Sequence, residues 1–174
     1  MITREIIEQN KKKGNVVQQI KEKKQVQIIG ISMLPFLNSN KIKTLFIVEC
    51  PSYKIGDIVI LKYKKSIVGI AVHRLVAYKN EKVVTKGDNN YLCDDAINEY
   101  DLLGKVEKAM LVDGRIIQIP SSRFVAMLSK CEGVICRKVS SLLTKVIHKV
   151  CIGIYYLYAV LRRWKYGYIL EKDM

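Results

Sequence analysis

The hydrophobic pattern divides the chain into three parts. Over residues 1–25, apolar residues recur near helical spacing beside lysine-rich positions, which predicts an N-terminal helical arm. This arm either packs on the domain or contacts a membrane or substrate. Residues 26–120 instead carry short runs rich in valine and isoleucine, separated by turn residues, and this pattern predicts a β-rich domain. Residues 121–174 return to helical spacing.

The β-rich part has no helical segment between its apolar runs. Short strands at this density indicate an antiparallel folded sheet or barrel. The fold expected for the whole chain is therefore mostly β, with an N-terminal helix and C-terminal amphipathic helices. Strands are predicted at 26–31, 45–49, 58–61, 67–78, 83–86, 103–111 and 115–119, with the last two joined in a hairpin around Asp113-Gly114.

The C-terminal part reads as a basic amphipathic helix. Apolar residues recur at steps of three and four, lysines and arginines fall mostly between them, and Gly133 is a possible kink. A tyrosine-rich, uncharged stretch at 150–161 follows, and it is too short to cross a bilayer. Residues 121–174 are thus a possible membrane-surface anchor, with packing on the β-rich domain or a partner as the alternative.

Charge and cysteine content narrow the partners. The 30 Lys and Arg against 16 Asp and Glu give a net charge of +14, which favours a polyanion such as anionic lipid or nucleic acid unless the lysines are simply solvated. The five cysteines contain no CxxC pair, and the chain has two histidines, so no metal site or cofactor is expected. We interpret the cysteines as small buried apolar residues in a reducing compartment.

Three features point to chemistry. Ser32 lies in Gly30-Ile31-Ser32-Met33-Leu34-Pro35, at the end of an apolar run. His73 lies within an apolar strand, and histidine is a side chain that can act as the general base for a serine. Asp94 and Asp95 follow a turn-rich stretch, and a histidine base needs such an acid to orient it.

Four motifs in order resemble the conserved boxes of type I signal peptidases, in the S24/S26 serine peptidase superfamily. They cover roughly residues 27–109. Signal peptidases of bacterial type have a lysine base where this chain has His73, so the resemblance is to the Ser/His branch of ER, archaeal and sporulation-type enzymes. The motifs are Gly30-Ile31-Ser32-Met33-Leu34-Pro35, Lys54-Ile55-Gly56-Asp57-Ile58-Val59, His73-Arg74-Leu75, and Thr85-Lys86-Gly87-Asp88-Asn89-Asn90 followed by Asp94-Asp95.

This resemblance implies a role for each matching residue. Ser32 would be the nucleophile, and its backbone N–H would form part of the oxyanion hole. His73 would be the base. The orienting acid would be Asp94, which we favour, or Asp95, and Asp88 would support the site.

The function expected is that of a serine endopeptidase that cleaves a leader, signal or precursor peptide. The alternatives are a self-cleaving regulator of the S24 type and a non-catalytic peptide- or membrane-binding module on the same scaffold. Fewer than 30 residues precede the first strand, which is too few for a helix-turn-helix domain, so nucleic acid is not the expected partner. Without an export signal or a full-length transmembrane helix in the sequence, we expect a cytoplasmic protein or one peripheral to the membrane.

Overall fold

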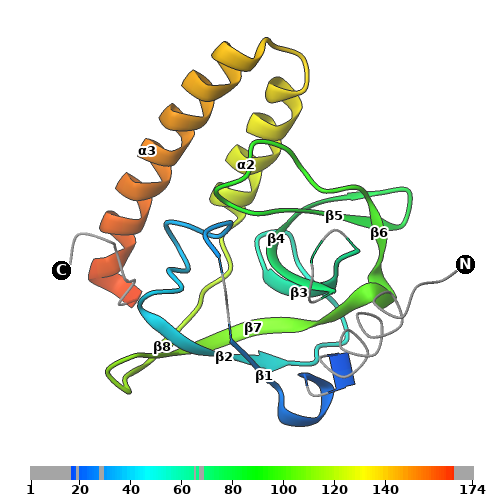
Figure 1. Ribbon diagram of the computed structural model, residues 1–174, viewed down its shortest axis with the longest axis vertical. Coiled ribbons are helices and arrows are strands. Elements are labelled where there is room, and N and C mark those ends of the chain that lie inside the picture. Colours follow the sequence, from blue (N-terminus) through cyan, green and yellow to red (C-terminus); the bar gives the residue numbers. More distant parts are fainter. Residues whose placement is uncertain (1–16, 19, 28–29, 65, 67–68, 167–174) are drawn as a thin grey trace, which may run out of the picture.

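The computed structural model describes residues 17–166 apart from 19, 28–29, 65 and 67–68, with side chains up to residue 161. Its centre is an eight-stranded antiparallel sheet that curls into a half-barrel, in the order β1-β2-β7-β3-β4-β5-β6 with β8 beside β7 (Figure 1). The prediction of a mostly β, antiparallel fold is confirmed. The strands are β1 (Gln25–Val26), β2 (Ile42–Val48), β3 (Ile58–Lys62), β4 (Ile70–Lys79), β5 (Lys82–Lys86), β6 (Ile97–Asn98), β7 (Leu102–Leu111) and β8 (Ile116–Gln118), and a 3-10 turn, Glu99–Asp101, precedes β7.

The centre of the sheet is buried on both faces. In β3, Ile58 and Ile60 contribute to one apolar cluster, whereas Val59 and Leu61 contribute to another on the opposite side. A strand covered on both sides needs apolar residues at every position, which explains the unbroken run in β3 where a half-exposed strand would alternate. The neighbouring strand β4 carries His73 opposite Val59.

Two local predictions had different outcomes. The hairpin around Asp113-Gly114 is confirmed, since β7 pairs with β8. The strand expected at 26–31 is wrong in extent, because pairing ends at Val26 and residues 30–37 form turns, with residues 28–29 outside the described part. Gly30 has a φ of +106°, a conformation that ends a strand. Ser32 therefore lies in a turn. Of the predicted N-terminal helix, residues 17, 18 and 20–23 are helical and residues 1–16 lie outside the described residues.

The C-terminal part is a hairpin of two helices, α2 (Arg123–Cys136) and α3 (Ser141–Tyr166). The kink considered at Gly133 is absent, because α2 runs through this residue and the break comes after Cys136. Gly133 is instead a site of close packing: a Cβ there would lie 2.5 Å from Cys93 Sγ. The expectation that the cysteines are buried holds for Cys136, whereas Cys50, Cys93 and Cys151 are half-buried and Cys131 is exposed.

The length of α3 qualifies the expectation that no helix is long enough to span a membrane. Ser141–Leu161 is long and apolar enough to cross a bilayer, by length and composition alone, with a mean hydropathy of 1.2. The expectation rests on the uncharged residues 150–161 alone, whereas the helix begins at Ser141 and includes Lys145 and Lys149.

The helical hairpin also supports the turn that carries Ser32. Phe36, which ends this turn, is buried in a cluster with Val125 of α2 and Tyr155 and Ala159 of α3. The rings of Phe36 and Tyr155 are 6.0 Å apart at a tilted angle, which is a favourable aromatic geometry. The nucleophile candidate is therefore held between the β-rich part and the helices.

Candidate active site

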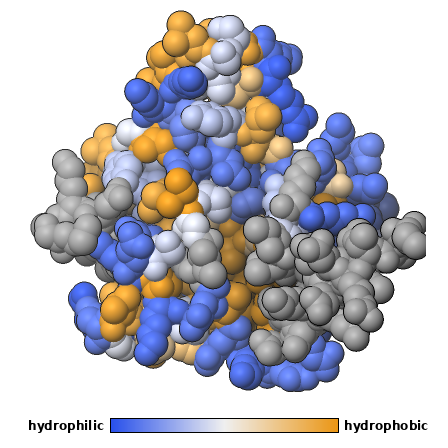
Figure 2. Space-filling view, viewed as in Figure 1, coloured by the Kyte–Doolittle hydropathy of each residue, from blue (hydrophilic) through white to orange (hydrophobic). Residues whose placement is uncertain are grey.

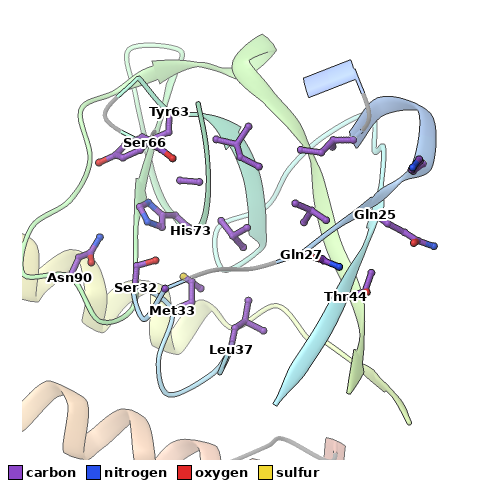
Figure 3. Close-up of a pocket in the computed structure, with 17 residues that line it drawn as sticks. Gln25, Gln27, Ser32, Met33, Leu37, Thr44, Tyr63, Ser66, His73 and Asn90 are labelled. Atoms are coloured by element: carbon purple, nitrogen blue, oxygen red, sulfur yellow. The ribbon is translucent and has the colours of Figure 1, made fainter. Parts of the chain in front are cut away.

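Ser32 and His73 face the same cavity, which has a volume of about 740 Å³. Figure 3 shows the two side chains next to each other on one side of it. Gln27 and Gly30, from the segment before Ser32, and Ile70–Val72, from the start of β4, also line the cavity. In the part of the chain that the structure describes, no hydrogen bond joins Ser32 Oγ to His73. Such bonds are often long until substrate is bound.

His73 is paired with Asp94. The distance from His73 Nδ1 to Asp94 Oδ2 is 2.6 Å, and both side chains are buried. An ionised carboxylate can only accept hydrogen bonds, so this contact places a proton on Nδ1. The lone pair is then on Nε2, which is the arrangement that a general base requires.

Asp94 is itself fixed by two further donors. Thr85 Oγ1 donates to Oδ2 at 2.7 Å, and the Tyr63 hydroxyl donates to Oδ1 at 3.1 Å. Burial and the adjacent Asp94 carboxylate raise the pKa of Tyr63 to about 12, so the hydroxyl keeps its proton at neutral pH. The Tyr63 ring also contacts the His73 ring edge-on, with 5.6 Å between the centroids. These contacts hold the acid and the imidazole in one orientation.

The other two candidate acids lie elsewhere. Asp95 is exposed, and the carboxylate that contacts His73 is that of Asp94. Asp88 is fully buried but forms a two-pronged ion pair with Arg74, at 2.9 Å to Nε and 2.7 Å to Nη2. Arg74 also donates to the carbonyl of Gly56 and lies 5.1 Å from the centre of the Phe36 ring. Asp88 thus supports the region behind the cavity and does not orient His73.

Successive residues of the segment 85–90 contact different parts of the site. The backbone N–H of Asn89 donates to the Ser32 carbonyl at 2.7 Å, which ties the segment to the turn of Ser32. Asn90 lines the cavity beside Ser32 and His73. Four contacts thereby connect the segment to its surroundings. They are Thr85 to Asp94, Lys86 to Glu132 of α2, Asp88 to Arg74, and Asn89 to Ser32.

Gly87 is the point of closest approach in this segment, and replacing it with alanine tests the connection. A Cβ there would lie 2.7 Å from both the Ser32 carbonyl oxygen and Asn90 Nδ2. We expect Gly87→Ala to displace the turn of Ser32 and to lower kcat/KM for the peptide cleavage proposed below by roughly 100-fold, since small shifts in catalytic geometry have effects of this size. Stability should fall by only about 1–3 kcal/mol. Gly153→Ala, at an exposed position of α3 where a Cβ would meet no atom within 4 Å, is the control for the added methyl group. Equal kinetics for the two variants would contradict the proposed role of the segment.

Several supporting residues were not singled out from the sequence. Thr85 and Lys86 stand in a quoted motif without an assigned role, and Tyr63 has no sequence signal because its partner is 31 residues away. Glu132 was also missed. Its buried carboxylate accepts from Lys86 Nζ at 2.8 Å and from the Tyr155 hydroxyl at 3.2 Å, and it contacts His148 Nδ1. Because Lys86 and Glu132 are both fully buried, this ion pair fixes α2 against β5.

Comparison of the chain with protein-family models, curated proteins and solved structures finds no match. Among the described residues, no group of three or more His, Cys, Asp and Glu side chains is placed to hold a metal ion. The described side chains at the cavity include the hydroxyl of Ser32 and the imidazole of His73, which is paired with the carboxylate of Asp94. The backbone N–H of Ser32 as an oxyanion donor stays a prediction.

Proposed function

We propose that the protein is a serine endopeptidase in which Ser32 is the nucleophile, His73 the general base and Asp94 the orienting acid. The observation that carries the proposal is the buried His73–Asp94 pair, whose His73 lines the same cavity as Ser32. Nucleophile, base and acid in this relation make up the arrangement that activates a serine for acyl transfer. The resemblance of four sequence motifs to the Ser/His branch of type I signal peptidases supports the same assignment.

The reaction proceeds in two halves. His73 Nε2 takes the proton of Ser32 Oγ as the oxygen attacks the scissile carbonyl, and Asp94 stabilises the resulting imidazolium. The C–N bond then breaks, the imidazolium proton goes to the leaving amine, and an acyl ester remains on Ser32. A water molecule, deprotonated by His73, hydrolyses this ester and regenerates the serine. The Ser32 backbone N–H would stabilise the oxyanion in both halves.

The substrate we propose is an extended segment of a leader, signal or precursor peptide. An extended chain can bind beside a strand edge through main-chain hydrogen bonds, and β1 is the terminal strand of the sheet beside the cavity. Apolar side chains such as Met33, Ile70 and Val72 line the cavity and would contact the side chains of the peptide.

The proposal is tested with a library of proteome-derived peptides whose new N-termini are identified by mass spectrometry. The wild-type protein is expected to produce a defined set of cleavages. Ser32→Ala and His73→Ala should each reduce them by at least 1000-fold, as expected for loss of a triad member. Ser66→Ala, at another serine that lines the cavity, should cleave at nearly the wild-type rate. Cleavage retained in both Ser32→Ala and His73→Ala would refute the proposal, and peptide binding without cleavage by the wild type would favour a binding module.

A further inference from the structure

The helical hairpin carries an apolar surface that no described part of the chain covers. On α3, six exposed apolar residues recur at steps of three and four, so they share one face of the helix. His148, Tyr155 and Ala159 lie on the opposite, buried face. We call the exposed set the outer face of α3; it consists of Leu142, Val146, Val150, Ile154, Leu157 and Leu161, of which Leu142 is 74% exposed.

The helix α2 also carries exposed apolar residues. Phe124, Met127, Val134 and Ile135 are all exposed, although α2 also has a buried face against the β-rich part. Figure 2 shows apolar side chains at the top of the molecule, where the hairpin lies, with hydrophilic ones beside them. Isolated exposed apolar residues are common, but a set that follows one helix face for about 28 Å marks an interaction surface.

The charges around this surface indicate the chemistry of its partner. The stretch 123–166 contains nine lysines and arginines and a single acidic residue, Glu132, which is buried in its ion pair with Lys86. Lys145 and Lys149 are exposed and adjoin the outer face of α3. The described surface of the two helices is thus apolar and cationic, without an exposed carboxylate. An apolar strip bordered by basic residues suits the boundary between acyl chains and anionic headgroups.

We propose that the outer face of α3, with the exposed apolar residues of α2, docks the protein on an anionic lipid surface, with α3 lying in the plane of the membrane. The length of α3 would also allow it to cross the membrane, but the packing argues against that orientation. A spanning α3 would take Lys145 and Lys149 toward the hydrocarbon and would separate Tyr155 and His148 from their partners on α2. In the plane, these contacts stay intact while the apolar side chains enter the lipid.

The experiment is vesicle flotation of the full chain. Vesicles of phosphatidylcholine alone are compared with vesicles that also contain phosphatidylglycerol. We expect binding to the anionic vesicles that weakens with added salt and that alkaline carbonate reverses. The variant Val146→Glu/Leu157→Glu should bind at least tenfold more weakly, because each glutamate places a charge where an apolar side chain entered the lipid.

The matched control is Val112→Glu/Ile116→Glu, in the β7–β8 hairpin, where Val112 follows β7 and Ile116 begins β8. These residues are 65% and 60% exposed, comparable to Val146 at 52% and Leu157 at 61%, and the change in net charge is the same. The control should bind within about twofold of the wild type. The proposal is overturned if the wild type does not float with anionic vesicles, if both double variants lose binding equally, or if carbonate fails to release the protein. A dimer that the Val146→Glu/Leu157→Glu change dissociates, without vesicle binding, would also overturn it.

Discussion

Asp94→Asn is expected to lower kcat by on the order of 10³–10⁴-fold, with a much smaller change in KM. The carboxylate of Asp94 accepts from His73 Nδ1, Thr85 Oγ1 and the Tyr63 hydroxyl. In the proposed mechanism, an asparagine removes the negative charge that stabilises the imidazolium formed during attack by Ser32. Its NH₂ group can also face Nδ1, which would place the imidazole proton on the wrong nitrogen. The measurement is the steady-state rate on a peptide substrate identified with the wild type.

Asp95→Asn is the matched control for this variant. The same chemical change is made one residue further along, at an exposed side chain that does not contact His73. Its rate should stay within about threefold of the wild type, as for a surface substitution. If Asp95→Asn were the inactive variant and Asp94→Asn the active one, the assignment of the acid would be reversed.

Arg74→Met is expected to destabilise the protein by about 3–5 kcal/mol. Arg74 and Asp88 are 1% and 0% exposed, and the guanidinium is the partner of the Asp88 carboxylate. Methionine preserves most of the apolar volume but leaves a buried carboxylate without its counter-charge. Because small domains have a total stability of about 5–15 kcal/mol, the midpoint of urea unfolding should shift markedly.

The double variant Arg74→Met/Asp88→Asn separates the ion pair from packing. It removes the unpaired charge, so it should be more stable than Arg74→Met alone even though it carries an additional substitution. Destabilisation of less than about 1 kcal/mol by Arg74→Met would contradict the importance of the pair. The effect of Arg74→Met is expected as a lower free energy of unfolding in urea. The rate of peptide cleavage should fall only in proportion to the fraction of folded protein.

The strands were predicted from local patterns, and the failures have identifiable causes. The strand β3 and the turn at Asp113-Gly114 were predictable because residues adjacent in the sequence determine them. The segment after Val26 also reads as a strand, but Gly30 and the turn that follows stop the pairing. The kink considered at Gly133 does not form, because a glycine in a helix can serve close packing as well as bending, and the position of Cys93 distinguishes the two.

The residues of the site that stand in sequence motifs were predictable. Residues whose contact partners lie far away in the sequence were not. The motifs brought Ser32, His73 and Asp94 to attention, and the structure brings His73 and Asp94 into contact and places Ser32 at the same cavity. Glu132 had no such signal, since its partner Lys86 lies 46 residues away on another element. A single glutamate in a basic helix looks like a solvated residue until the fold shows it buried. Spacing along the chain cannot convey this, because burial of a charge is decided by tertiary packing.

The central claim is that Ser32 is the acylated nucleophile, and trapping the acyl-enzyme tests it most directly. An intact peptide that the wild-type protein cleaves is mixed with the protein, and the reaction is quenched in acid within the first turnover. The adduct is then mapped by mass spectrometry. We predict an ester on Ser32 that carries the N-terminal part of the peptide, is lost with hydroxylamine and is absent in Ser32→Ala. An adduct on another residue, or wild-type cleavage by Ser32→Ala, would contradict the account.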